Sequence, residues 1–599
     1  MNSQKRSSLR TFLSYAWALT RPYFSSDQKW KARLLLGSIV ALNLALVYMA
    51  VLFNEWYKLF YDALQDKNEQ VFWTQMTRFA WLAAVFIVIA VYKFYLTQLL
   101  EMRWRAWMTG HYLQRWLANH AFYHLELMRF AHQPDPAGGP DTGVDNPDNP
   151  DQRIQEDINL FTSQTIGLSM GLLNAVVTLA SFVGILWGLS GGFAFTLGGS
   201  NYNIPGFMVW MAIIYSLAGS VLTHFIGRPQ IALNFQQQRV EADFRHHMVR
   251  VREYSESIAL ERGETVERQQ LDVRFGHVLS NYLALLRAQK RLIWFTSFFG
   301  QAAVVFPFLV AAPRFFSGAI QLGALMQISS AFGRVQDALS WFVDSYSSLA
   351  SWRATTDRLT SFETSFQALT HKNQGLVAIH SDELIADKLH LQLPNGSVLL
   401  AQTDLSAKPG DSILLQGPSG SGKSTLFRAL AGIWPFASGQ LHRPANSMFI
   451  PQKPYFPNGA LRDALAYPNH PTAYTDAELA DALNRALLPQ LANQLDQVGA
   501  WGQSLSGGEQ QRLAIARVLL KKPTWVFADE ATSALDSATE EAIYRSLLAQ
   551  IKSEKGAIVS IAHRPGVSSF HHQHWVFERQ PEDSTARYKV HSEPGQTQV

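Results

Sequence analysis

Residues 417–425, with the sequence GPSGSGKST, have the residue types and spacing of a phosphate-binding loop. Spaced glycines let backbone N–H groups turn inward around a phosphate, and a helix that begins at the loop adds its positive dipole end. We expect Lys423 to reach the β- and γ-phosphates of ATP and the Ser424 hydroxyl to hold Mg²⁺. A chance match in a Gly/Ser-rich turn is the alternative for this loop taken alone. The expected nucleotide-binding residues of the loop are Gly417, Pro418, Ser419, Gly420, Ser421, Gly422, Lys423, Ser424 and Thr425.

Three short segments after this loop end in polar side chains that could act on the phosphates. The strand-like segment WVFADE ends in Asp529, which suits a water-mediated Mg²⁺ contact, and Glu530, which suits positioning or deprotonating an attacking water. Gln452, in FIPQKPY, could contact Mg²⁺ and that water, and His563, after the segment IVSIA, could reach the γ-phosphate. Taken alone, these could be a loop amide, a pair of strand-end carboxylates and a buried histidine. Their order after the loop favours nucleotide hydrolysis.

A second glycine-rich motif, LSGGEQ, lies at residues 505–510 and opens a predicted helix. Ser506 stands where a helix cap would stand, and backbone amides at such a helix start can bind a γ-phosphate. The motif SALD, at residues 533–536, follows the two carboxylates. The candidates in these two motifs are Leu505, Ser506, Gly507, Gly508, Glu509 and Gln510, then Ser533 and Asp536.

Six largely apolar segments precede residue 350, and each is long enough to cross a bilayer. They lie at 34–53, 79–100, 166–189, 207–226, 293–316 and 322–349. The connections after the second and fourth segments are rich in Arg, whereas 191–206 contains neither Lys nor Arg. Because Lys and Arg stay on the cytoplasmic side, we expect a multi-pass membrane protein with both termini and the phosphate-binding half cytoplasmic.

Composition and patterning together predict two kinds of domain. The near balance of 51 Lys and Arg against 47 Asp and Glu gives no global sign of nucleic-acid binding. The absence of cysteine from the sequence excludes disulfides and thiolate metal sites. The expected fold is an all-α six-helix transmembrane domain fused to an α/β P-loop NTPase domain. The expected boundaries are 1–33 for an N-terminal cytoplasmic segment, 34–360 for the transmembrane domain, 361–380 for a linker and 381–599 for the NTPase domain.

Three further segments carry weaker signals. Residues 132–150 are rich in Pro, Gly, Asp and Asn, and a flexible turn fits them better than a cation-binding loop because no EF-hand spacing is present. Residues 361–375 are polar and unpatterned, as suits a linker. His571, His572 and His574 could suggest a metal site, but an exposed polar chain end is the better interpretation.

The sixth apolar segment carries charges that could contact a transported solute. Arg334 and Asp337 are three residues apart, so they share one helix face and can pair. Ionised groups at membrane depth are costly and usually face a cavity or a partner. We expect these two to line the substrate pathway. The alternative is that this stretch already lies in a cytoplasmic extension, where both are solvated.

An aromatic ring for stacking adenine is missing ahead of the phosphate-binding loop. No Phe, Tyr or Trp occurs in 367–426, and the expected position holds Leu393, with His390 as the nearest flat side chain. Stacking on an aromatic side chain gains roughly 1–3 kcal/mol per base in single-strand binders. We therefore expect binding to depend mainly on the triphosphate, with weak discrimination between ATP and GTP.

The ordered set of motifs resembles the ATP-binding cassette (ABC) superfamily, whose specific signature is LSGGEQ. The resemblance implies that two cassettes pair head to tail, so that each phosphate-binding loop faces residues 505–510 of the other chain, with Ser533 and Asp536 in a loop at the dimer contact. One cassette with six spans resembles a half-transporter, which implies a homodimer with a second copy of the chain. It also implies an ATPase coupled to transport, with ATP and Mg²⁺ as ligands and no nucleic-acid partner.

Longer segments narrow the resemblance further. RWRAWMT at 103–109, DNPDQRIQEDI at 148–158 and NEWYKLFYDALQ at 54–65 are similar to the SbmA/BacA-type transporters, and subfamily D of peroxisomal fatty-acyl transporters shares much of the pattern. The resemblance implies ATP-driven uptake of peptides or other bulky hydrophilic solutes. Transport or export of long-chain fatty acids, acyl-CoA or lipids stays open, as does a proton-coupled permease whose cassette only regulates.

Overall fold

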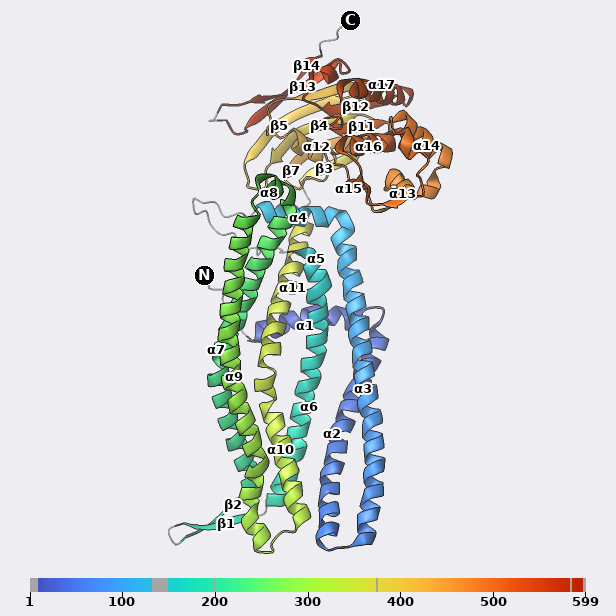
Figure 1. The fold of residues 1–599 in the computed structure, drawn as a ribbon. Helices are drawn as coiled ribbons and strands as arrows, with labels where there is room; N and C mark the ends of the chain where they lie inside the picture. Colours follow the sequence, from blue (N-terminus) through green and yellow to red (C-terminus); the bar gives the residue numbers. More distant parts are fainter. Residues whose placement is uncertain are drawn as a thin grey trace. The chain divides into compact units, whose positions relative to one another are not determined.

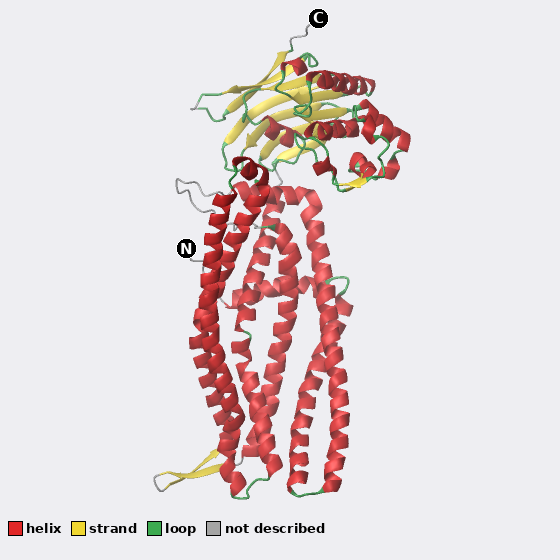
Figure 2. Ribbon diagram, viewed as in Figure 1, coloured by secondary structure: helices red, strands yellow, loops and turns green. Residues whose placement is uncertain are grey.

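The computed structural model describes residues 9–131, 149–190, 192–197, 200–372, 375–581 and 584–595. The chain divides into two compact units, one formed by Met1–Tyr112 with Asp151–Thr360 and one by Leu113–Pro150 with Ser361–Val599. Figure 1 traces the chain through its elements, and Figure 2 shows that strands are concentrated in the second unit. Most of the Pro/Gly/Asp-rich insert, residues 132–148, lies outside the described residues.

The first unit is built mainly from long helices. They are α1 (Leu9–Ser25), α2 (Lys29–Gln65), α3 (Glu69–Leu117), α6 (Ile158–Ser190), α7 (Phe207–Glu253), α9 (Glu264–Phe316) and α10 (Leu322–Asp344). Shorter elements between them are α5 (Pro150–Gln152), a π-helical turn (Arg153–Asp157), α8 (Ser255–Glu261), and an antiparallel hairpin of β1 (Gly192–Leu197) and β2 (Ser200–Pro205).

Five helical stretches of the described residues are long and apolar enough to cross a membrane, and they contain the first five predicted spans. The sixth predicted span corresponds to α10, which is less apolar because it carries Arg334, Asp337 and Asp344. Its crossing of the membrane therefore stays a prediction. One face of α10 nevertheless packs in an apolar cluster with α6 and α7, whose members include Phe182, Leu186, Met208, Ala212, Ile328, Phe332 and Val335.

Helix α11 (Tyr346–Lys372) continues through most of the segment expected to be a linker. Its buried side chains recur every three or four residues, at Leu359, Phe362, Phe366 and Leu369. One face of the helix is therefore packed while polar residues cover the other. The expectation of an unpatterned segment was wrong as far as Lys372, because four apolar residues at helical spacing are enough to fix a helix against a core.

The second unit contains a six-stranded sheet in the order β14-β13-β6-β12-β11-β8. Its central strands β6 (Ser412–Gln416), β11 (Trp525–Asp529) and β12 (Ala557–Ile561) are buried runs, as parallel strands covered on both faces should be. β8 (Ser447–Ile450) and β13 (Gln573–Arg579) add parallel neighbours, and β14 (Tyr588–Pro594) pairs antiparallel with β13. The carboxyl ends of the parallel strands share one edge, so the loops after β6, β8, β11 and β12 meet there.

A four-stranded sheet in the order β3-β7-β4-β5 and several helices complete this unit. The strands are β3 (Leu376–His380), β4 (Leu384–Gln392), β5 (Val398–Ala407) and β7 (Ala437–Arg443), with a small pair of β9 (Gly459–Ala460) and β10 (Val498–Gly499). The helices are α12 (Lys423–Leu430), α13 (Leu461–Ala466), α14 (Asp476–Arg485), α15 (Trp501–Ser504), α16 (Gly507–Lys521), α17 (Ser537–Ser553) and α18 (Pro565–Ser568).

Helix α4 (Ala121–Ala131) belongs to the second unit, although it follows α3 along the chain. Nε2 of the buried His124 lies 3.1 Å from the carbonyl oxygen of Ile433, and Leu127 packs against the apolar core of the sheets. The chain that leaves α3 is therefore attached to the segment just after α12.

Candidate active site

The segment between β6 and α12 forms one wall of a cavity of about 960 Å³. Gly422 has φ 92°, and a Cβ atom on it would lie 2.2 Å from Leu399 Cδ2, so both the backbone conformation and the space require glycine. Helix α12 begins directly after it, which leaves the free N–H groups of a helix start at the loop. Of the predicted loop residues, the cavity is lined by Ser419, Gly420, Gly422, Lys423, Ser424 and Thr425.

Lys423 is almost fully buried beneath the loop, with 6% of its surface exposed. Its Nζ donates to the carbonyl oxygens of Gly417 and Pro418, each at 2.9 Å. Burial lowers the pKa of the Lys423 ammonium, and the nearby carboxylates of Glu530 and Asp529 oppose that shift. The loop therefore holds one buried positive charge whose present partners are neutral carbonyl oxygens.

The other polar groups at this end of the cavity fit a magnesium–triphosphate group. Burial raises the pKa of the Asp529 carboxyl, and the neighbouring Ser424 hydroxyl opposes that shift, so two of the predicted magnesium contacts lie together. Ser421 does not line the cavity, and its buried Oγ has no hydrogen-bond partner within the described part of the chain. When bound, Mg²⁺ would supply charge neutralisation at the phosphates through oxygen ligands of this kind.

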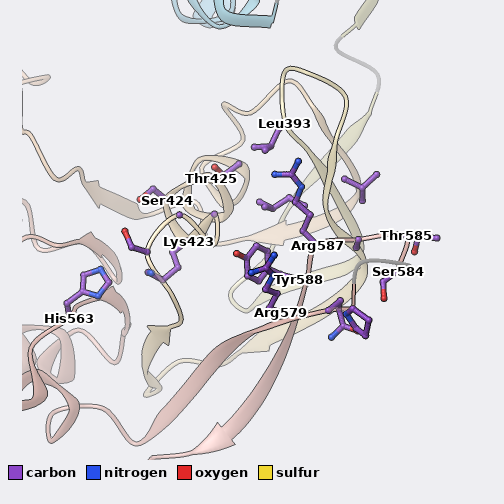
Figure 3. A pocket seen from close by; sticks show the side chains of 18 of the residues that line it. Leu393, Lys423, Ser424, Thr425, His563, Arg579, Ser584, Thr585, Arg587 and Tyr588 are labelled. Atoms are coloured by element: carbon purple, nitrogen blue, oxygen red, sulfur yellow. The ribbon is translucent and has the colours of Figure 1, made fainter. Parts of the chain in front are cut away.

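The carboxylate of Glu530 joins the other two residues predicted to act on an attacking water. Gln452 Nε2 donates to Glu530 Oε2 at 2.8 Å, and His563 Nε2 lies 3.2 Å from Glu530 Oε1. The three side chains follow β8, β11 and β12 and all line the cavity, and Figure 3 shows His563 at the same end as Lys423. The sheet topology therefore brings all three catalytic candidates to one point.

The backbone of Glu530 has φ 48°, in the left-handed region that residues with a side chain seldom adopt. Its N–H donates to the carbonyl oxygen of Ile561 at 3.0 Å, and its carbonyl oxygen accepts from Gln511 Nε2 at 3.2 Å. Such a conformation costs on the order of 1–3 kcal/mol and is concentrated at functional sites. Hydrogen bonds on both sides of the residue thus hold the carboxylate in a fixed position.

Gln511 is a positioning residue that the sequence analysis missed. Besides Glu530, its Nε2 donates to Ser533 Oγ at 2.9 Å, and its Oε1 accepts from the Ala534 N–H at 2.8 Å. It is buried in α16, directly after LSGGEQ. One amide therefore ties the helix of the LSGGEQ motif to the candidate catalytic residue Glu530 and to the SALD motif. The sequence signal that could have identified Gln511 is its position directly after the LSGGEQ motif.

The LSGGEQ motif begins a helix as predicted, and the SALD motif directly precedes another helix. Ser506 caps α16, accepting from the Glu509 N–H at 3.4 Å while the Glu509 carboxylate accepts from the Ser506 N–H at 3.0 Å. Asp536 caps α17, and hydrogen bonding to Thr539 lowers the pKa of its carboxyl. Among the residues that the structure describes, none of 505–510 lines the cavity. Within one chain, the signature motif is therefore separate from the phosphate-binding loop.

The wall of the cavity farther from His563 contains Leu393, as expected, and also residues that the sequence analysis did not consider. Leu393 lies in the cavity wall, and so does the hairpin of β13 and β14, with Arg579, Arg587 and Tyr588. Figure 3 shows these hairpin side chains on the side of Lys423 away from His563. The hairpin contains no recognisable motif and lies about 150 residues after the phosphate-binding loop in the sequence. Only the fold shows that it lines the nucleotide cavity.

The histidines near the chain end are not an exposed polar tail, contrary to expectation. His571 is 2% exposed, and its two ring nitrogens lie 2.9 Å from the Val567 carbonyl oxygen and 2.9 Å from Ser560 Oγ. Burial lowers the pKa of His571 to about 4. His574 lies within β13, which pairs with the central strand β6, and it is buried too, whereas the side chain of His572 is exposed.

Comparisons with known proteins identify the family. Residues 19–316 match the model for ABC transporter transmembrane region 2, and residues 400–533 match that for ABC transporter. The inner membrane ABC transporter ATP-binding protein YddA of Escherichia coli is 34% identical, with 93% of this chain and 96% of that protein covered. The chain belongs to the ABC transporter family.

Other relatives place this transporter near subfamily D and assign its activity. ABC transporter D family member 2, chloroplastic, of Arabidopsis thaliana is 32% identical over 95% of this chain and 86% of that protein. The lysosomal cobalamin transporter ABCD4 of Mus musculus is 26% identical over 80% of each. A bacterial Atm1-family ABC exporter with ATP bound shares the fold, with TM-score 0.67 and 17% identity over 91% of this chain and 94% of that one. The transporter is therefore an ATP-driven half-transporter whose cassette hydrolyses ATP to move a solute across the membrane.

Proposed function

We propose that this half-transporter works as a homodimer in the inner membrane and takes up peptides or other bulky hydrophilic solutes, as in the SbmA/BacA-like branch. The observation that carries the homodimer is the arrangement of Gln452, Glu530 and His563 in a cavity that receives no residue of 505–510 from its own chain. The peptide cargo rests on the resemblance of residues 54–65, 103–109 and 148–158 to the SbmA/BacA-type transporters. One chain brings the candidate hydrolysis residues together but leaves the cavity without the LSGGEQ motif. A second cassette would supply that motif.

In the proposed mechanism, each side chain has one task. Glu530 accepts the proton of the attacking water, and Gln452 and His563, which lie beside its two oxygens, hold that water in line. When ATP binds, the Lys423 ammonium exchanges its two carbonyl partners for phosphate oxygens. Its positive charge then lies beside the transferred phosphoryl group. Phosphoryl transfer needs little covalent help, so positioning and charge are sufficient.

In the proposed dimer, the second copy supplies the LSGGEQ residues 505–510 that the cavity lacks. Ser506 and the first N–H groups of α16 are solvent-exposed in one chain and form a capped helix start, which suits an anion. In a head-to-tail pair they face the γ-phosphate held by the loop of the other copy. Gln511 would then transmit this contact to Glu530 within its own chain, because it bonds the backbone of that residue.

The packing of α10 against α2 supports a place for Arg334 and Asp337 at membrane depth. Gly323 lies so close to α2 that a Cβ atom would be 2.0 Å from the Lys58 carbonyl oxygen, and Asn54 Nδ2 donates to the Gln327 carbonyl oxygen at 3.0 Å. Continued by seven residues, this antiparallel register puts Arg334 level with about residue 47, within the charge-free run 34–53. A cytoplasmic extension would lie outside that run.

Both charges are exposed in the single chain, and no ion pair joins them among the described residues, so the predicted pairing is not found. Their face of α10 is the one that the apolar cluster with α6 and α7 leaves uncovered. Charges at this depth need water, cargo or a partner chain beside them. A central pathway between two copies provides all three, and its charges favour a polar solute.

Two alternatives remain in the proposal. Relatives named as D-family transporters keep fatty acids, acyl-CoA or lipids as possible cargo, and the name of the mouse relative adds cobalamin. A proton-coupled permease with a regulatory cassette is less well supported, because regulation alone would not require both Glu530 and His563 at the cavity.

The Arg-rich connections favour a cytoplasmic cassette and cytoplasmic termini.

Uptake measurements in a deletion strain test the proposal. The strain would carry the wild type, Glu530→Gln, or the control Glu541→Gln, whose exposed side chain bonds only Arg545 among the described residues. A labelled peptide antibiotic, cobalamin and a long-chain acyl-CoA would be offered in turn. We expect peptide uptake with the wild type and the control but not with Glu530→Gln. Uptake of acyl-CoA alone would favour the lipid alternative, and uptake that survives Glu530→Gln would favour the permease.

A further inference from the structure

The hairpin of β13 and β14 forms the end of the nucleotide cavity opposite the hydrolysis residues. Tyr588, Arg579 and Arg587 all line this end, together with Leu393 and Val398. Segment 367–426, where a stacking ring was sought, contains none. No aromatic ring precedes the phosphate-binding loop in this segment, but the cavity contains the ring of Tyr588, which lies near the C-terminal end of the cassette.

The hairpin is fixed against the walls of the nucleotide site. Arg579 and Tyr588 are directly paired across it, and the Gln580 N–H donates to the Arg587 carbonyl oxygen at 2.9 Å. The Arg587 N–H in turn donates to the carbonyl oxygen of Val398, the first residue of β5, at 3.2 Å. The two sides of the hairpin and the start of β5 are therefore held in one hydrogen-bonded layer.

The same hairpin touches the phosphate-binding loop. A Cβ atom on Gly417, the first loop residue, would lie 2.7 Å from Cβ of Phe577 in β13. The Phe577 ring is buried and lies 6.3 Å from the Tyr588 ring, edge to face. Tyr588 is thus held one ring away from the start of the loop, with one part of its surface packed on the core and another in the cavity.

We propose that Tyr588 is the base-contacting residue of the nucleotide site and that Arg579 and Arg587 lie beside the base. Bases stack on aromatic rings and on guanidinium planes, and both kinds of surface tolerate any base. Arginine only donates hydrogen bonds, so it can donate to acceptor ring nitrogens of either purine. The ligand class is a purine nucleoside triphosphate, bound with help from its base but with weak preference between ATP and GTP. This inference rests on nucleotide binding at the loop.

Ligand binding to the full-length protein in nanodiscs separates a base contact from a phosphate contact. The probes are AMP-PNP, GMP-PNP and inorganic tripolyphosphate, each with Mg²⁺, and the key variant is Tyr588→Leu, which keeps apolar contact with the core but removes the ring. We expect its Kd for both nucleotide analogues to rise about fivefold to 150-fold, as loss of a stacked base implies, and its Kd for tripolyphosphate to change less than twofold. Tyr588→Phe should stay within about threefold of the wild type. The control is Tyr474→Leu, a partly buried tyrosine outside the cavity that should change no Kd.

Two results would overturn the inference. One is unchanged analogue binding in Tyr588→Leu, and the other is an equal loss for analogues and tripolyphosphate, which would mean that the hairpin acts on phosphates. If Tyr588→Leu does not fold, photolabelling of the wild type with 8-azido-ATP decides the matter. We expect the label on a peptide containing Tyr588, and a label confined to 390–399 would contradict the proposal. A wild type that binds tripolyphosphate and nucleotides equally refutes only this inference, whereas one that binds neither refutes the proposed function.

Discussion

Replacing Glu530 by Gln changes one charge at the hydrolysis site and little else. The side-chain oxygen of Gln can still accept from Gln452, whose Nε2 lies 2.8 Å from Glu530 Oε2. His563 loses an acidic partner 3.2 Å away, but its side chain is 51% exposed, so this pair contributes at most about 1 kcal/mol to stability. For a domain of this size that corresponds to a melting-temperature shift of no more than about 4 °C.

Hydrolysis should respond far more strongly than stability to this substitution. An amide does not accept the proton of water, and the loss of a general base typically slows a reaction about 10²–10⁴-fold, or roughly 2.7–5.4 kcal/mol of barrier. The assay is kcat and the Kd for ATP with purified protein in nanodiscs. We expect kcat to fall at least about 100-fold while Kd stays within about threefold. Lys423→Ala should instead weaken ATP binding, because it removes the buried charge aimed at the phosphates.

Glu541→Gln provides the matched control for Glu530→Gln. Glu541 is exposed on α17, bonds Arg545 and does not line the cavity, so its replacement should leave kcat within about twofold. Retention of more than half of the wild-type kcat in Glu530→Gln would refute its role as the base. A fall in melting temperature of more than about 10 °C would show instead that the carboxylate is needed for folding.

Three further predictions concern other parts of the molecule. Arg334→Ala should lower solute uptake and leave basal ATPase activity intact, and unchanged uptake with Asp337 also replaced would remove both from the pathway. Leu393→Tyr should lower the Kd for ATP because it adds a second ring to the cavity. The unmodified protein should hydrolyse ATP and GTP with kcat/KM values within about tenfold, a difference of ~1.4 kcal/mol. A hundredfold preference for ATP would mean that another group recognises the base. Burial lowers the pKa of His571 from 6.5 to about 4, so the unfolded chain binds more protons below pH 6.5 and stability should fall as the pH drops from there towards 4. His571→Gln should flatten the decrease in melting temperature between pH 7 and pH 5, and an unchanged slope would contradict the buried, neutral ring.

The convergence of Glu530 and His563 could be predicted because each follows a buried apolar strand. β11 and β12 are short apolar runs, and parallel strands leave their carboxyl ends at one edge, so Glu530 and His563 had to meet near the loop after β6. The glycine spacing of the loop is likewise a direct consequence of the positive φ and close packing found at Gly422. Local sequence carried enough information in both cases.

The features that were missed depend on contacts between distant segments. Tyr588 reaches the cavity because β13 pairs with β6, a pairing that no local pattern announces. His571 is buried for the same reason, next to a strand that enters the sheet. In α11 the polar residues hid the helical spacing of Phe362, Phe366 and Leu369, which only a packed face reveals. These residues acquire their roles from tertiary structure.

The central claim, that two copies share each ATP site, is tested most directly by cross-linking. The natural chain has no cysteine, so Ser419→Cys in one tagged copy and Ser506→Cys in another provide two thiols that can react only across copies. Both side chains are exposed in the single chain. In the Glu530→Gln background, ATP should produce a cross-linked pair carrying both tags when a short bismaleimide is added, with little product in its absence. Failure to form this pair with ATP, although each thiol is labelled by a monofunctional maleimide, would contradict a shared site.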